Sequence, residues 1–124
     1  MIVEDYVSFE TAKLLKEKEF DEATLGYYLD DKDKLYFDRS SDDWNSNHVG
    51  YISAPTLQRA RKWLREVHNL HIEVFVTTNH LMFQWKIYRT ENTSLYFAGT
   101  SLSYYEKYEE ACEAGINYCL RNLI

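Results

Sequence analysis

The sequence predicts an α+β fold: an antiparallel three-stranded meander (residues 71–100) packed by two amphipathic helices, with an N-terminal helix and a short hairpin. Apolar and polar residues alternate in three successive segments of the meander. The flanking residues 55–68 and 104–122 carry apolar residues at spacings of three and four. Because 124 residues suit one domain, we expect a single domain with an acidic part at 1–54 and an α-β-β-β-α core at 55–124.

The acidic part should begin with a helix. Ser8 is a favourable N-cap, and Glu10 would lie near the positive end of the helix dipole. Ala12 and Leu15 supply an apolar side. We expect this helix to end near Glu19.

A short hairpin should follow, with strands near 27–29 and 35–37 around a polar turn at 30–34. The aspartates of this turn lack the spacing of a calcium loop, and the lysines among them would repel a cation, so we expect no metal there. Residues 39–50 show no periodicity and predict a loop. Trp44 within that loop should pack back on the protein.

The second helix should span residues 55–68, with Pro55 in its first turn, where a missing N–H costs nothing. Its apolar stripe consists of Leu57, Ala60, Leu64 and Val67. Four basic residues make it the most basic element of the chain: Arg59, Arg61, Lys62 and Arg65.

The three strands of the meander should place one apolar row against the helices, with a turn at 78–80. The predicted row is Ile72, Val74, Val76, Phe83, Trp85, Ile87, Leu95, Phe97 and Gly99. Alternation then puts Phe75, Tyr88 and Tyr96, together with Lys86, on the opposite face. Exposed rings of this kind usually mark a binding surface, so these four residues are the candidate interaction surface.

The last helix should begin at a capping box formed by Ser103 and Glu106. Its apolar stripe consists of Tyr104, Tyr108, Ala111, Cys112, Gly115, Ile116, Cys119 and Leu123. The two cysteines lie roughly 10.5 Å apart along a helix axis, which is too far for a disulfide. We expect both to be small, unreactive core residues.

The sequence contains no recognisable catalytic, cofactor-binding or metal-binding motif, so an enzyme is the weaker hypothesis and no cofactor is expected. The acidic part holds 13 acids and 6 bases, which disfavours nucleic acid as the main partner. Helix, three strands, helix is also the order of elements in a double-stranded-RNA-binding domain, but residues 104–110 are acidic where that module is basic.

The N-terminus has neither the basic nor the apolar region of a signal peptide, and no apolar run approaches the ~18 residues of a membrane-spanning helix. Together with two unpaired cysteines, these features predict a cytoplasmic protein with no membrane contact.

Six segments form an ordered set that resembles small uncharacterised proteins encoded by phages and prophages of Bacteroidetes. They are residues 7–18, 54–57, 62–66, 71–74, 108–111 and 114–116. The resemblance implies a cytoplasmic, phage-derived protein and transfers no active site.

Three functions stay open at this point. The leading hypothesis is a non-catalytic protein–protein interaction module that binds a protein partner, or a second copy of itself, through the candidate interaction surface. The first alternative is a nucleic-acid-associated accessory protein whose phosphate contacts would be the four basic residues of the second helix. The second alternative is a small-molecule-binding or enzymatic role without a recognisable motif.

Overall fold

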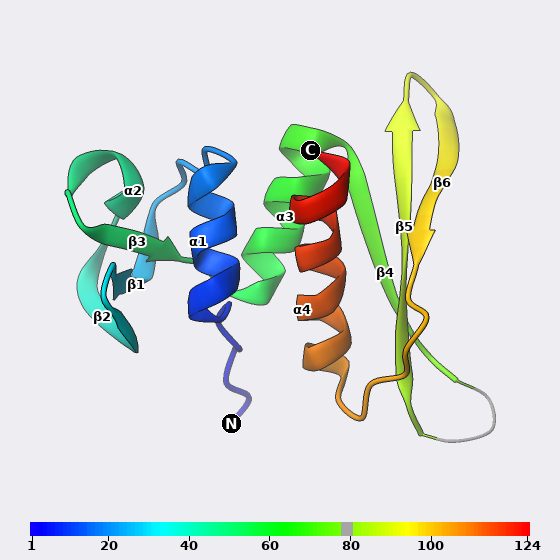
Figure 1. Ribbon diagram of the computed structural model, residues 1–124, viewed down its shortest axis with the longest axis horizontal. Coiled ribbons are helices and arrows are strands. Elements are labelled where there is room, and N and C mark those ends of the chain that lie inside the picture. Colours follow the sequence, from blue (N-terminus) through cyan, green and yellow to red (C-terminus); the bar gives the residue numbers. More distant parts are fainter. Residues whose placement is uncertain (78–80) are drawn as a thin grey trace. The chain divides into compact units, whose positions relative to one another are not determined.

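The computed structural model describes residues 1–77 and 81–124, and it confirms the α+β class (Figure 1). Its helices accompany two antiparallel three-stranded sheets, with strand orders β2-β1-β3 and β4-β5-β6. The chain divides into two compact units, Met1–Gln58 (unit 1) and Arg59–Ile124 (unit 2). The single domain stays a prediction, and the predicted turn at 78–80 lies outside the described residues.

Unit 1 combines the β2-β1-β3 sheet with two helices, and its core includes Val7, Leu15, Phe20 and Ile52. Its elements are α1 (Phe9–Glu17), β1 (Thr24–Leu29), β2 (Lys32–Asp42), α2 (Trp44–Asn47) and β3 (Tyr51–Ala54).

The predicted hairpin is confirmed as β1 and β2, but its turn is tighter than expected and only Asp30 and Asp31 lie between the strands. The predicted loop at 39–50 is wrong, because β2 continues to Asp42 and α2 follows. The backbone N–H of Ser46 donates to the Asp43 carboxylate at 3.1 Å, which caps this short helix. A four-residue strand, β3, was not predicted, since so short a segment has no readable alternation.

Helix α1 begins and ends by identifiable hydrogen bonds. The predicted N-cap is confirmed, because the Thr11 N–H donates to Ser8 Oγ at 3.2 Å. At the other end, the N–H of Glu19 donates to the Lys16 carbonyl and the N–H of Phe20 donates to the Leu15 carbonyl. This is a Schellman motif, and it holds Glu19 at φ 66°, a left-handed conformation that favours glycine.

Replacing Glu19 with glycine should therefore stabilise the protein by about 1 kcal/mol, because a left-handed conformation is strained for a residue with a Cβ. Urea unfolding followed by far-UV circular dichroism would measure the gain. Glu19→Ala is the matched control, since it removes the charge and keeps the Cβ. If alanine stabilised as much as glycine, the charge and not the backbone would be the cause.

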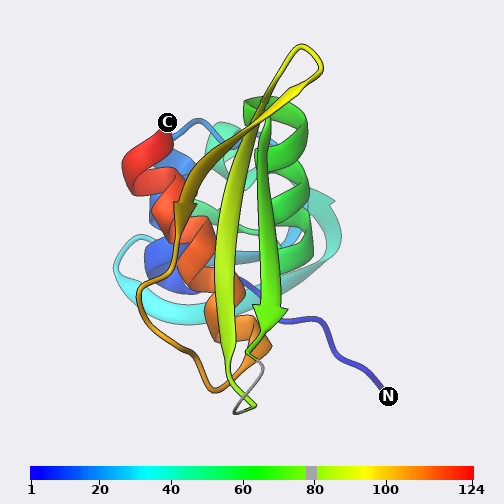
Figure 2. The same ribbon diagram turned by 90° about the vertical axis from the view of Figure 1, so that its right-hand side faces the viewer.

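Unit 2 contains the predicted meander and its two helices. Its elements are β4 (Leu70–Val76), β5 (Phe83–Glu91), β6 (Ser94–Thr100), α4 (Tyr108–Tyr118) and a π-helix (Cys119–Leu123), with α3 (Leu57–His68) crossing the boundary from unit 1. The two long helices lie on the same face of the sheet, and Figure 2 looks onto the opposite face. We call that opposite face the outer face.

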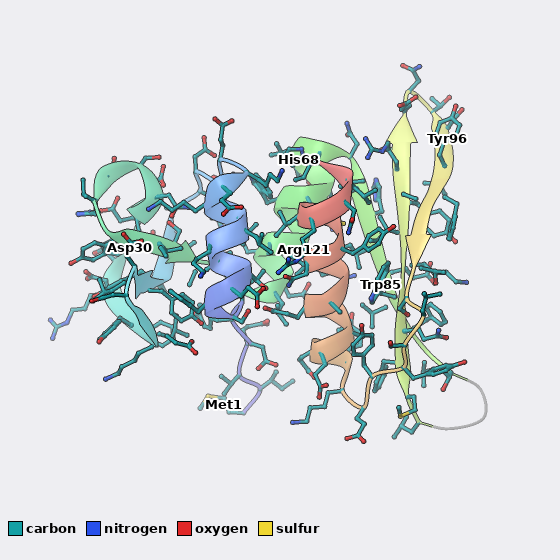
Figure 3. The ribbon with its side chains drawn as sticks, in the orientation of Figure 1. Met1, Asp30, His68, Trp85, Tyr96 and Arg121 are labelled. Atoms are coloured by element: carbon teal, nitrogen blue, oxygen red, sulfur yellow. The ribbon has the colours of Figure 1, made fainter. Side chains whose placement is uncertain are left out.

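Helix α4 and the π-helix that follows it are fixed to the sheet by close contacts. A Cβ on Gly115 of α4 would lie 3.0 Å from Ile72 Cγ2, so the helix backbone approaches the strands closely. Trp85, which points from β5 toward α4 (Figure 3), packs its ring 4.9 Å from that of Tyr118. Arg89 on β5 donates to the Leu123 carbonyl at 3.0 Å, placing a cation at the negative end of the helical segment.

Three details of the predicted helices are wrong. The Ser103 capping box does not form, because Tyr105 exchanges backbone hydrogen bonds with Phe83 in strand geometry, and α4 begins only at Tyr108. Pro55 precedes α3, with its carbonyl accepting from the Val7 N–H. Val67 is 54 % exposed and does not belong to the buried stripe of α3. Trp63, which was not predicted to be part of that stripe, is buried instead.

Candidate interaction surface

Three of the four predicted surface residues do lie together on the outer face. The pairing of β4 with β5 sets Phe75 opposite Gln84 and Glu73 opposite Lys86, and Tyr88 follows two residues later on the same face. Lys86 Nζ lies 4.7 Å from the centre of the Phe75 ring, a cation–π contact across the strands.

Tyr96 is the exception, and its predicted place was wrong. A bulge between Ile87 and Tyr88 in the β5–β6 pairing leaves one extra residue on β6, so Tyr96 lies opposite Arg89 and turns toward the helix side. Phe97 takes its place opposite Tyr88, and the two ring centres are 6.0 Å apart. A slip of one residue exchanges the faces of a strand, which is why simple alternation failed here.

The bulge coincides with two small residues of β6. A Cβ on Gly99 would lie 2.8 Å from Tyr118 Cε1, so the Tyr118 ring of α4 lies directly against the strand backbone there. Ala98 is the residue left without a partner in the register. Two adjacent small residues inside an otherwise aromatic strand are the one signal in the sequence that would have indicated this irregularity.

The outer face is therefore an aromatic surface with charges at its centre. We define the outer-face cluster as Phe75, Lys86, Tyr88 and Phe97. Phe97 is 62 % exposed, while the other three are half-buried. Glu73 lies opposite Lys86, and His71 opposite Tyr88. Such a mixture of rings and charged groups is suited to a protein surface rather than to a small apolar ligand.

The four basic residues of the alternative hypothesis do not act as one group. Arg61 donates to the Ile72 carbonyl at 2.7 Å and to the Tyr108 hydroxyl at 3.0 Å, so its guanidinium joins α3 to the sheet and to α4. Arg59, Lys62 and Arg65 are exposed on α3. Three cations on one helix make a weaker site for a phosphate backbone than four.

Unit 1 holds an aromatic cluster that was not predicted. Trp44 packs back on the protein as expected: it is 5 % exposed, and its Nε1 donates to the Thr24 carbonyl at 2.8 Å. Its ring lies 4.6 Å from that of Tyr27, 5.7 Å from Tyr51 and 5.0 Å from His48. Its members come from β1, from α2 and the residue that follows it, and from β3; because α2 and β3 were not predicted, the cluster was missed.

Titratable groups border this cluster. His48 Nε2 lies 2.8 Å from Asp42 Oδ2, and hydrogen bonds from Asn47 and then His48 lower the pKa of Asp42. Burial, followed by the charges of Tyr51 and neighbouring groups, raises the pKa of Tyr27. We assign the cluster a packing role, because its rings face one another.

The two cysteines are buried in α4 and at the start of the π-helix. Burial raises the pKa of Cys112 to about 11 and that of Cys119 to about 12. Since the thiolate is the nucleophile, both groups are held in their unreactive form at neutral pH.

Among residues 1–77 and 81–124, no three His, Cys, Asp or Glu side chains gather closely enough to hold a metal ion. None of the helices in these same residues is both long and apolar enough to cross a bilayer. Comparison of the chain with protein-family models, curated proteins and solved structures finds no match.

Proposed function

We propose that this chain is a non-catalytic, phage-derived interaction module that binds a protein partner in the cytoplasm through the outer-face cluster. The observation that carries the proposal is the row of rings across the strands, with Phe75 and Tyr88 half-buried and Phe97 mostly exposed. The phage origin and the cytoplasmic setting rest on the sequence resemblance and on the two unpaired cysteines.

The chemistry of the cluster supports a protein as the ligand. Aromatic side chains dominate the energetics of protein interfaces, because they bury a large area and lose few rotatable bonds. Lys86, held over the Phe75 ring and opposite Glu73, adds a fixed charge that a partner carboxylate would recognise.

A matched pull-down from extracts of phage-infected host cells tests the proposal. The double variant Phe75→Ser/Tyr88→Ser should lose bands that the wild type captures, while circular dichroism shows that it stays folded. Tyr104→Ser is the control, because Tyr104 is 59 % exposed and lies outside the sheet. Bands that survive the double variant, or vanish equally in the control, would contradict a docking role for this face.

Binding of nucleic acid through Arg59, Lys62 and Arg65 is the second candidate, favoured only by their exposure on one helix. Its signature would be affinity that falls steeply as salt rises, because phosphate contacts release counterions. Replacing all three residues with serine would then abolish the binding and leave the pull-down unchanged.

A further inference from the structure

Strand β6 lies at an edge of its sheet, since it pairs with β5 and with no other strand of the described residues (Figure 2). A strand at an edge presents unpaired backbone N–H and C=O groups along its free side. Another β-strand is the most suitable partner for these groups, because its own backbone groups pair with them regularly along the edge.

Natural edge strands are usually protected against such pairing by lysine, proline or an inward-pointing charge. β6 reads Ser-Leu-Tyr-Phe-Ala-Gly-Thr and contains none of these. Leu95 and Phe97 on the outer face are 61 % and 62 % exposed, and Tyr96 on the helix side is 52 % exposed. The bulge at Ala98 is the one feature that limits pairing, and it leaves the first half of the strand regular.

We propose that β6 pairs antiparallel with β6 of a second copy of this chain, which joins the two β4-β5-β6 sheets into one. We infer that the partner strand is a second β6 from the absence of charge on this strand. In a two-fold antiparallel pair each strand faces its own sequence, so a charged residue near the axis would meet its like. β6 carries no charge, although the chain as a whole has a net charge of −6.

The other edge of the sheet is a poorer partner for β6. β4 carries Glu73 and His71, and it would pair with β6 head to tail without closing on itself. Pairing of β6 with β6 instead uses the β6 edge of both copies at once and gives a closed dimer. It also aligns the exposed side chains of Leu95, Tyr96 and Phe97 with their counterparts on both faces, which removes apolar surface from water.

This inference goes beyond the proposed function, because it depends on the free edge of β6 and not on Phe75 or Tyr88. Analytical ultracentrifugation over micromolar to near-millimolar concentrations tests it. The wild type should dimerise, and Tyr96→Lys should raise the dimer dissociation constant by about tenfold or more, since it places two lysines near the axis. The control Phe75→Ser should leave dimerisation unchanged.

Cysteine cross-linking tests the geometry independently. In a background with Cys112→Ala and Cys119→Ala, single cysteines at each position from Ser94 to Thr100 are oxidised in turn. Residues opposite their own copies lie close enough for a disulfide, so cross-linking should peak at one position near the middle of the strand and fall toward both ends.

Three results would overturn the inference. The first is a monomer at every concentration. The second is a dimer that Phe75→Ser dissociates and Tyr96→Lys does not, which would place the contact on the outer face. The third is cross-linking that is uniform along the strand.

Discussion

Replacing Trp44 with alanine should destabilise unit 1 by about 3–5 kcal/mol, the usual cost of removing a buried tryptophan. The side chain is 5 % exposed, and its ring contacts those of Tyr27, Tyr51 and His48. The truncation would also leave the Thr24 carbonyl without the indole donor that it accepts from. A loss of this size is a large part of the 5–15 kcal/mol, roughly, that stabilises a typical domain.

Amide hydrogen exchange resolved by residue is the suitable measurement, because it reports the stability of β1 and β3 separately from that of unit 2. Trp44→Phe is the control: it keeps a ring and removes the indole donor, so it should cost about 1–3 kcal/mol. Unchanged protection in β1 and β3 of the alanine variant would mean that Trp44 only rests on the sheet and does not hold it together.

The same residue illustrates how far the sequence could be used to predict unit 1. That Trp44 would pack back on the protein followed from its size and polarity, and the structure confirms this. The end of β2 before it and the short helix α2 that it begins did not follow. Residues 39–50 are polar, and their structure depends on the pairing of β2 with β1, which reaches Asp42, and on Asp43 capping a four-residue helix. Such short elements are specified by tertiary contacts and not by periodicity.

In unit 2 the prediction succeeded for the elements that are long enough to show a clear periodic pattern. Three strands and two helices were predicted in the right order, because each has enough residues for a pattern of period 2 or 3.6 to stand out. The prediction failed where the placement of a single residue mattered. The bulge at Ala98 places Phe97 on the outer face instead of Tyr96. Arg61 was predicted as a phosphate contact, but its hydrogen bonds link α3 to β4 and to α4. The role of Arg61 depends on contacts with residues of other elements. The bulge had one local signal, the adjacent small residues Ala98 and Gly99, which alternation alone does not use.

The backbone of α4 approaches the sheet closely at Gly115, so a large side chain at this position should have a large effect on unit 2. A Cβ at this position would meet Ile72 Cγ2 at 3.0 Å and Trp85 Cβ at 3.4 Å, so alanine is already tight. Alanine also favours the helix over glycine by about 1 kcal/mol, so the two effects oppose each other and Gly115→Ala should change stability little.

Gly115→Leu should instead cost about 3 kcal/mol, because three further carbon atoms have to enter the space that Ile72 and Trp85 already fill. α4 would have to lift from β4 and β5, which should lower the urea midpoint and loosen the contact of Trp85 with Tyr118. Near-UV circular dichroism and residue-resolved hydrogen exchange would measure both. Ala114→Leu, one residue earlier on the half-buried side of the same helix, controls for the added leucine. Equal urea midpoints for Gly115→Leu and the wild type would show that α4 does not rest on the sheet at Gly115.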